Sequence, residues 1–333
     1  MNGNELPPCA GVSGKIIAAR RVLLMTHCRP DGDALGSTFG MRAFLRHNGI
    51  DAEVLLPDGM PRRYRGLCLG ALPRLLPGEA DGFDLFLALD CANPERLGCG
   101  DQLTVETLRA GNFICIDHHR GNCLDAPDSW VDPAAGSTCQ MVMELIDFLN
   151  LPLPPEGATM LLTGMMTDTG CFCFSNTTGR SFRAAALAAD YGADIERIAN
   201  AVFFSKPMNQ LNFEAEMVGK CLRIACGGKL AYACLPDELM AKYDFELRED
   251  EGLIDILRGL EGVVIAMLVH RRPDGWRVSL RSKDSRFPVA PTARQFGGGG
   301  HDLAAGCTID VPEFAQVEAT LIPLFDRLLE ERP

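Results

Sequence analysis

The sequence of 333 residues lacks the features that mark membrane, secreted and disulfide-rich proteins. No apolar run approaches the roughly 18–20 residues that span a bilayer. No apolar h-region precedes Leu6-Pro7-Pro8-Cys9, a segment that faintly resembles a lipoprotein cleavage site. None of the 14 cysteines belongs to a C-x-x-C pair, and several, such as Cys115 and Cys234, lie inside apolar runs. We therefore expect a cytoplasmic protein without membrane contact, whose cysteines are reduced and partly buried.

An excess of positive charge is also missing, since the formal net charge is −12. Proteins that bind long nucleic acid through many phosphates are usually basic. We therefore expect no binding of long nucleic acid. A small anionic substrate held at one local site remains compatible with the composition, and bound cations would neutralise part of the negative charge.

The length and a hydrophobic fraction of 47% favour two domains. In the first half, amphipathic segments such as 36–48 alternate with four short apolar runs, at 22–26, 52–56, 84–89 and 113–116. This alternation predicts an α/β domain, with a parallel sheet and helices on its faces. Further helices are predicted at 137–149 and 156–166.

The second half has the pattern of a smaller α+β domain. An Ala-rich stretch, 181–204, predicts a continuing helix that ends near Pro207. Hairpins are predicted within 222–235 and across 263–283, and a closing helix at 313–331. The predicted domains are 1–185 and 213–333, joined by a helical linker at 186–212.

Acidic and histidine side chains follow the predicted strands where each strand ends. The candidate residues are His27, Asp31, Asp33, Asp90, Asp117, His118 and His119, with Asp168 before a later glycine turn. Ligands of open α/β sheets bind outside the carboxyl ends of the strands, so these side chains should converge. Each cluster alone also fits a plain reading, as a helix cap, an Asp-rich turn or a surface loop.

Taken together, these side chains indicate a centre with two metal ions. Two ions about 3.5–4 Å apart, bridged by one carboxylate, would use six of these groups, which are more than one ion needs. The six residues are His27, Asp31, Asp33, Asp90, His118 and Asp168. Such donors suit Mn²⁺ or Mg²⁺ better than Zn²⁺, for which cysteine ligands would be expected at a structural site. The reaction typical of such a pair is attack of a bridging hydroxide on phosphorus.

A second candidate region lies near the C-terminus. Arg281-Ser282-Lys283 ends a predicted strand, and the glycine run 297–300 leads into His301. Glycines allow backbone N–H groups to approach a phosphate, and an arginine can clamp it bidentately. The candidate substrate-binding residues are Arg281, Ser282, Gly299, Gly300 and His301. A flexible loop is the alternative reading.

These motifs resemble those of the DHH phosphoesterase superfamily, and the second half resembles its DHH-associated C-terminal domain. The resemblance implies that His27, Asp31 and Asp90 hold a first metal. It implies that Asp33, Asp90, His118 and Asp168 hold a second, with Asp90 as the bridge. His119 would contact the substrate or the attacking water, and Asp117 would orient the histidines. Two Mn²⁺ ions, or Mg²⁺, are the implied cofactors.

Among branches of the superfamily, the two-domain layout and the segment 174–178 look most like bacterial oligoribonucleases of the nano-RNase type. This implies hydrolysis of oligonucleotides of about 2–5 nucleotides to monophosphates, and of 3′-phosphoadenosine 5′-phosphate, in a cleft between the domains. The alternatives are a phosphodiesterase for linear pApA or cyclic dinucleotides, a RecJ-type exonuclease, a family II pyrophosphatase and a catalytically silent nucleotide-binding module. A homodimer is compatible with all of them.

Overall fold

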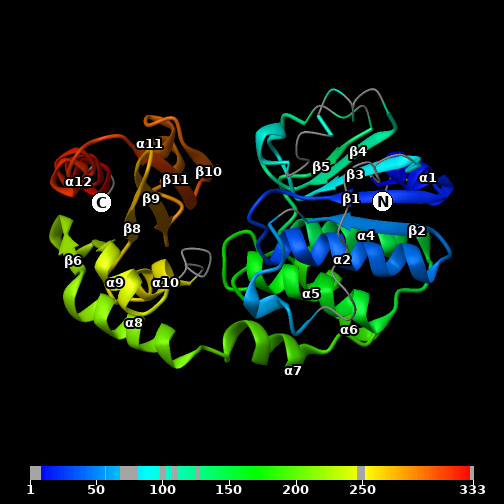
Figure 1. Cartoon of the computed structure of the whole chain (residues 1–333), viewed down its shortest axis with the longest axis horizontal. Helices are drawn as coiled ribbons and strands as arrows, with labels where there is room; N and C mark the ends of the chain where they lie inside the picture. Colours follow the sequence, from blue (N-terminus) through cyan, green and yellow to red (C-terminus); the bar gives the residue numbers. More distant parts are fainter. Residues whose placement is uncertain are drawn as a thin grey trace. The chain divides into compact units, whose positions relative to one another are not determined.

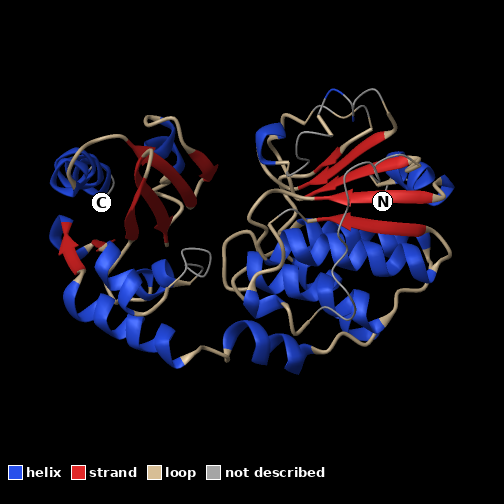
Figure 2. Cartoon of the chain, in the orientation of Figure 1, coloured by secondary structure: helices blue, strands red, loops and turns tan. Residues whose placement is uncertain are grey.

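The computed structural model describes residues 9–56, 58–67, 82–97, 103–104, 106, 108, 111–124, 126, 128–245 and 252–330 (Figures 1 and 2). The chain divides into two compact units, Met1–Ser205 and Lys206–Pro333. This division falls inside 186–212, whose role as a separate linker stays a prediction. In the described part of the chain, no helix is long and apolar enough to cross a membrane.

The first unit is built on a five-stranded parallel sheet, which confirms the predicted α/β fold. Its strands are β1 (Arg21–Met25), β2 (Asp51–Leu55), β3 (Leu85–Leu89), β4 (Phe113–Asp117) and β5 (Trp130–Val131), in the order β2-β1-β3-β4-β5. The first four lie where the apolar runs predict them. β5 has two residues, too few to give a recognisable apolar run.

The two faces of this sheet carry different cores. Its helices are α1 (Ala10–Ala18), α2 (Gly32–His47), α4 (Thr138–Leu149), α5 (Pro155–Asp168) and α6 (Gly179–Asp190). Because side chains alternate along a strand, Val22 and Leu24 of β1 join the larger core with α1, α2, α4 and α5. Leu23 and Met25 face a smaller core with loop residues such as Leu124. The large core fixes the helices whose ends carry the acidic side chains.

Helices α2 and α5 pack through glycines, and they lie side by side in Figures 1 and 2. A Cβ placed on Gly36 of α2 would lie 2.5 Å from the Met160 carbonyl oxygen and 3.0 Å from the Gly164 nitrogen, both in α5. A Cβ on Gly164 would lie 2.9 Å from Asp33. The absence of these methyl groups therefore sets how closely the start of α2 can approach α5.

We predict that Gly36→Ala lowers the free energy of unfolding by about 1–3 kcal/mol, because the new methyl group meets backbone atoms that cannot move aside. Gly14→Ala is the matched control. Gly14 is exposed in the middle of α1 with open space around its Cα, so alanine there should be neutral or stabilise by up to about 1 kcal/mol. Denaturant unfolding compares the two variants, and equal effects would show that α2 and α5 tolerate a wider spacing.

The prediction of one helix over 181–204 is wrong. Helix α6 ends at Asp190, a short α7 (Ile195–Ile198) follows, and a π-helix, η3 (Ala199–Phe203), completes the segment. Gly192 has φ +85°, the left-handed conformation that ends helices, and the Asp194 side chain caps α7 by accepting from Arg197 N at 3.0 Å. The Ala-rich composition favours helix throughout and therefore gives no sign that one helix ends and another begins within this segment.

The second unit contains a six-stranded mixed sheet in the order β10-β11-β9-β8-β7-β6, which confirms the α+β prediction. Its strands are β6 (Leu222–Ala225), β7 (Leu230–Leu235), β8 (Ile265–Arg272), β9 (Gly275–Ser282), β10 (Gly299–His301) and β11 (Ala304–Ile309). Its helices are α8 (Met208–Lys220), α9 (Asp237–Lys242), α10 (Leu253–Arg258), α11 (Ala290–Arg294) and α12 (Phe314–Glu330). Both predicted hairpins are present, as β6–β7 and β8–β9.

Candidate metal centre

The carboxyl ends of β1, β3 and β4 meet at the point of the first sheet where ligands are expected. The strand order reverses at β1, which lies between β2 and β3, and ligands of such sheets bind outside the ends of the strands at this point. His27 follows β1 by two residues, Asp90 comes directly after β3, and His118 comes directly after β4. The parallel sheet thus brings three side chains together from distant parts of the sequence.

The start of α2 adds two carboxylates. Asp31 is the N-cap, and its Oδ1 accepts from the backbone nitrogens of Asp33 and Ala34, each at 3.1 Å. Its other oxygen, Oδ2, lies 3.8 Å from His27 Nε2. One short motif therefore both begins the helix and turns a carboxylate toward the strand ends.

His27, Asp31 and Asp90 form a first group of donors whose candidate ligand atoms all lie within 4.8 Å of one another. His27 Nε2 is 3.8 Å from Asp31 Oδ2 and 3.8 Å from Asp90 Oδ2, too far for hydrogen bonds but close enough to share one cation. Asp90 has φ +56°, which is uncommon outside glycine. Such backbone strain clusters at functional sites, because the surrounding structure must impose it.

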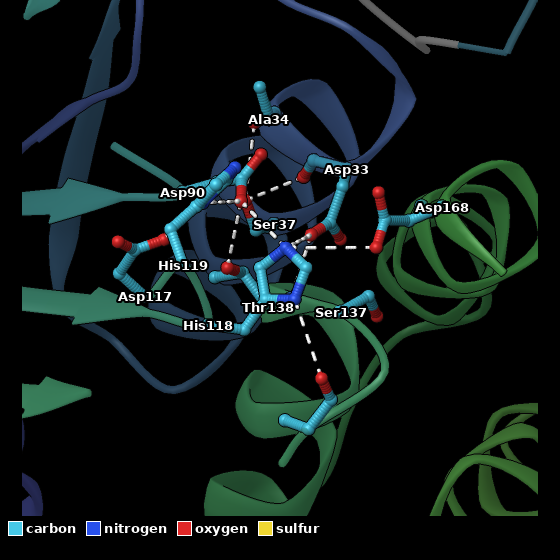
Figure 3. Close-up of polar contacts among 12 residues, drawn as sticks. Asp33, Ala34, Ser37, Asp90, Asp117, His118, His119, Ser137, Thr138 and Asp168 are labelled. Carbon is cyan, nitrogen blue, oxygen red and sulfur yellow. Dashed lines mark hydrogen bonds and ion pairs between the residues drawn. The ribbon is translucent and has the colours of Figure 1, made fainter. Parts of the chain in front are cut away.

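Asp33, His118 and Asp168 form a second group (Figure 3). His118 Nε2 lies 3.7 Å from Asp33 Oδ2, 3.6 Å from Asp168 Oδ2 and 3.5 Å from Asp90 Oδ1. Asp90 therefore turns Oδ2 toward the first group and Oδ1 toward the second. The structure brings all six residues that we predicted as ligands into two groups sharing one carboxylate, and metal binding by them stays a prediction.

The beginning of α4 holds the Asp33 carboxylate in place. The backbone nitrogens of Thr138 and Cys139 donate to its Oδ2 and Oδ1, at 2.7 and 2.9 Å. Thr138 Oγ1 also donates to Asp90 Oδ1 at 3.0 Å, and Ser137 caps the helix by accepting from Gln140 N. Unpaired N–H groups and the helix dipole make this a favourable place for a negative charge. Sequence reasoning missed Thr138, for which a serine cap before an apolar helix was the available signal.

His119 is held by Asp117 rather than by a helix. Its Nδ1 lies 2.7 Å from Asp117 Oδ1, and Asn122 Nδ2 donates to Asp117 Oδ2 at 2.6 Å. The same nitrogen of His119 is 3.6 Å from Asp90 Oδ1, so the ring borders the shared carboxylate. Asp117 thus orients His119, and Asn122, which sequence reasoning did not single out, orients Asp117.

A strained turn follows Asp168 at the end of α5. Gly170, Cys171 and Phe172 have successive φ angles of +56°, +55° and +63°. The left-handed conformation costs about 1–2 kcal/mol for each residue other than glycine. Asn176 folds back over the turn, and its Nδ2 donates to Asp168 Oδ2 at 3.3 Å and to the Asp168 carbonyl oxygen at 3.2 Å. The turn therefore fixes one of the candidate ligands from its C-terminal side.

The charges in this centre shift each other's proton affinity. Burial raises the pKa of Asp33 to about 6, with Asp168 adding to the effect, and burial raises the pKa of Asp90 to about 7, with Asp33 adding to it. Burial opposes a charge on His119, but the Asp117 hydrogen bond and Asp90 outweigh it and raise its pKa to about 10. Without a cation, Asp33 and Asp90 therefore bind protons more readily than ordinary carboxyl groups. The donor set therefore fits divalent cations, which would displace those protons.

We predict that Mn²⁺ binding strengthens as the pH rises from 5 to 8. The folded pKa values of Asp33 and Asp90 lie above their ordinary value of 3.8, so these groups favour folding at low pH and lose that contribution as the pH rises through about 6 and 7. A bound cation replaces the protons. The apparent affinity should therefore rise by up to about tenfold per pH unit for each proton displaced.

Calorimetric titration with Mn²⁺ at pH 5, 6, 7 and 8 tests this dependence, together with the rise in melting temperature that Mn²⁺ produces. Asp128→Asn is the control, because Asp128 pairs with Lys15 on the surface and should leave the pH dependence unchanged. An affinity that does not vary with pH would contradict the protonated carboxylates.

The second unit places two of its predicted substrate residues in one row. His301 of β10 lies opposite Ala304 of β11, and Ala304 lies opposite Arg281 of β9. Paired residues share a face of the sheet, so Arg281 and His301 flank the small Ala304 side chain. Gly300 has φ +133°, and a Cβ there would lie 2.4 Å from the Ala304 carbonyl oxygen.

Two details of this region differ from the pattern expected for a glycine-rich loop. Gly299 and Gly300 belong to the edge strand β10 and pair with β11, so their backbone is ordered by the sheet. Ser282 is buried on the face opposite to its neighbour Arg281, and its hydroxyl donates to the Asp284 carbonyl oxygen at 3.0 Å. The row therefore contains Arg281 and His301 but leaves Ser282 out.

Comparison with known proteins gives concordant results for both units. Residues 21–165 match the DHH family, N-terminal domain, and residues 227–330 match the DHHA1 domain. The bifunctional oligoribonuclease and PAP phosphatase NrnA of Thermus thermophilus is 33% identical over 296 residues, covering 86% of this chain and 84% of that protein. The cyclic-di-AMP phosphodiesterase GdpP of Geobacillus thermodenitrificans is 29% identical, covering 92% of this chain but 47% of that protein.

A solved structure shares the fold of the whole chain. An exopolyphosphatase-related protein from Bacteroides fragilis superposes with a TM-score of 0.81 at 22% identity, and the match covers 99% of this chain and 98% of that one. At this identity the likeness concerns the fold alone. The order of elements in both units is therefore one that a solved structure also has.

Proposed function

The chain belongs to the DHH family and carries a DHHA1 domain, and from this premise we propose that it hydrolyses short oligonucleotides to nucleoside monophosphates with two divalent cations. The observation that carries the proposal is the pair of donor groups that share Asp90. Two cations bridged by one carboxylate are the arrangement used for in-line displacement at phosphorus. Dephosphorylation of 3′-phosphoadenosine 5′-phosphate is the accompanying activity that we propose.

Our choice of substrate depends on how much of each relative's length matches this chain, as well as on the activity for which the relative is named. The Thermus relative, named as an oligoribonuclease and PAP phosphatase, matches this chain over most of both lengths. The cyclic-di-AMP phosphodiesterase is matched over less than half of its own length, so more of that protein lies outside the match. The cyclic-dinucleotide reading therefore stays the second candidate, supported by the 29% identity over the shared part.

The residues would hold the cations in the two observed groups. His27, Asp31 and Asp90 would bind one, and Asp33, Asp90, His118 and Asp168 the other. When bound, the cations would supply an activated water and would offset the charge on the phosphoryl group. Mn²⁺ is the cation that we propose, with Mg²⁺ as the alternative, because all donors are carboxylate oxygens or imidazole nitrogens.

His119 has a different proposed role, next to the donors. Asp117 accepts from its Nδ1 and keeps the ring positively charged at neutral pH, because it helps to raise the pKa of His119 to about 10. With Nδ1 occupied by Asp117, His119 would contact the substrate through Nε2, donating to a phosphoryl oxygen or to the leaving oxygen. Asn122 restrains Asp117 and so keeps the imidazole in this orientation.

The row of Arg281 and His301 gives the second unit a proposed role in holding a substrate phosphate. Arginine offers a planar set of donors that matches phosphate oxygens, and imidazole adds another donor. One such local site, in a chain of net charge −12, suits a short substrate better than a long strand. A cytoplasmic location and a homodimer remain part of the proposal, each open to separate measurement.

We predict that RNAs of two to five nucleotides are hydrolysed faster than longer RNAs in Mn²⁺, because no extended basic surface is expected to hold a long strand. A panel of dinucleotide to decamer RNA, linear pApA, 3′-phosphoadenosine 5′-phosphate and pyrophosphate measures this preference. Asp90→Ala is the control, since loss of the shared carboxylate should abolish turnover of every substrate. Equal rates on long strands would favour the RecJ-type alternative, and rapid cleavage of pyrophosphate alone would favour a pyrophosphatase.

We further predict that Arg281→Ala or His301→Ala weakens nucleotide binding without changing metal content. A charge-assisted hydrogen bond contributes roughly 1.5–3 kcal/mol, so the loss in affinity should be about ten- to hundredfold. Kinetics with a dinucleotide and metal stoichiometry should be measured on the same preparations. Arg327→Ala, on the exposed side of α12, is the control. Loss of metal would show that the metal ligands are misassigned. Unchanged kinetics would show that Arg281 and His301 do not bind the substrate.

A further inference from the structure

An exposed arginine lies directly beside the first donor group. Arg96 Nη2 is 3.0 Å from His27 Nδ1, and Arg96 is solvent-exposed whereas His27 is buried. The backbone of the arginine is tied to the histidine's loop, because Cys28 N donates to the Arg96 carbonyl oxygen at 2.7 Å and His27 pairs with Leu97. The guanidinium can therefore change its contacts, but it cannot leave the neighbourhood of the centre.

The segment that carries Arg96 is itself well defined. Asn93 caps the short 3₁₀ helix η2 (Pro94–Arg96) by accepting from Glu95 N at 2.8 Å, and Arg96 N donates to the Asn93 carbonyl oxygen at 3.0 Å. Asp90, three residues before Asn93, is the carboxylate shared by both donor groups. The same short loop thus joins the shared carboxylate to a positive charge.

His27 offers Arg96 an acceptor that it also shares with a backbone contact. Nδ1 of His27 has two neighbours, the Cys28 carbonyl oxygen at 2.9 Å and Arg96 Nη2 at 3.0 Å. The first needs a proton on Nδ1 and the second needs a lone pair there, so only one bond can form at a time. The contact of Arg96 with His27 therefore excludes the contact of His27 with Cys28, and His27 holds the guanidinium in only one of the two arrangements.

The ion pairs of the described residues distinguish Arg96 from a structural arginine of the same unit. Among the residues that the structure describes, no acidic side chain forms an ion pair with Arg96. Arg180 in the same unit shows the contrast, because Glu144 accepts from two of its nitrogens and Asp132 from a third. Arg180 therefore has a structural role, whereas the described residues leave the exposed guanidinium of Arg96 without an ion pair.

We propose that Arg96 is a substrate-binding residue that donates to the phosphoryl oxygens of the substrate at the metal centre. This inference rests on the proposed phosphoesterase function and adds a phosphate contact within the first unit, separate from Arg281 and His301. The guanidinium presents parallel N–H groups that match two oxygens of one phosphate, and it carries a positive charge. The competing explanation is that Arg96 only orients His27.

The test compares Arg96→Ala and Arg96→Lys with Arg183→Ala, an exposed arginine on α6, in the full-length Mn²⁺-loaded protein. Three quantities are measured: Mn²⁺ stoichiometry and affinity, binding of inorganic phosphate by calorimetry, and turnover of bis(p-nitrophenyl) phosphate and of a dinucleotide. We expect Arg96→Ala to lose about ten- to hundredfold in phosphate affinity and in kcat/KM, with Mn²⁺ binding unchanged. Arg96→Lys should lose less, because lysine keeps the positive charge but lacks the parallel N–H groups of the guanidinium. Arg183→Ala should match the wild type.

Two outcomes overturn the proposal. Unchanged phosphate affinity and turnover in Arg96→Ala would show that the guanidinium does not reach the substrate. A loss of Mn²⁺ affinity that accounts for the loss of turnover would show that Arg96 only positions His27. Failure of the proposed function would be seen in the wild-type protein instead. A wild-type protein that cleaves bis(p-nitrophenyl) phosphate but not the dinucleotide would have another substrate. Phosphate binding to the loaded protein then still tests Arg96, even without any turnover.

Discussion

The mutual repulsion of carboxylates packed at one end of a sheet is the constraint on which the rest of the first unit depends. Asp33 and Asp90 are each only 1% exposed, and Asp31 and Asp168 border them. Water cannot stabilise charges at such depth, so the fold must supply other partners or bind protons. The pKa values of Asp33 and Asp90 are raised, which favours the second solution when no cation is present.

The fold offsets part of this repulsion with backbone groups rather than with opposite charges. Asp33 accepts from two amides at the start of α4, and Asp31 accepts from two amides at the start of its own helix α2. Helix N-termini stabilise negative charge without occupying the space in which a cation would lie. A lysine or arginine in that space would satisfy the carboxylates equally well but would remove the possibility of metal binding. Backbone amides therefore fix the donors, while each carboxylate oxygen keeps a lone pair for a cation.

The packing of helices sets the distances between these donors. Asp33 lies at the beginning of α2 and Asp168 at the end of α5, and glycines let the two helices approach closely. Because a Cβ on Gly164 would collide with Asp33 itself, the glycine also shapes the carboxylate's surroundings. A close-packed interior transmits such changes instead of absorbing them. The separation of Asp33 and Asp168 is therefore set by the packing of α2 against α5.

The candidate ligands could be found from the sequence because their positions follow from strand ends, and strand ends follow from apolar runs. His27, Asp90 and His118 are placed by the parallel sheet, and no knowledge of side-chain contacts is needed to bring them together. Thr138 and Arg96 could not be found this way, since their roles arise from contacts across the fold. The strand β10 was not predicted from the sequence, for a related reason. Glycines have no side-chain pattern to reveal a strand, and only pairing with β11 orders them.

The acidic centre also explains how a chain of net charge −12 can accept an anionic substrate at all. Four carboxylates repel a phosphate as long as they are ionised without cations. Two divalent cations would balance those four charges, and Asp117 would balance His119. The positive charge that remains beside the centre would then be that of Arg96. On this argument the sign of the potential seen by the substrate reverses when the donor groups are filled. Substrate binding at the centre must then follow metal binding, since the same site in its empty state attracts protons and excludes phosphates.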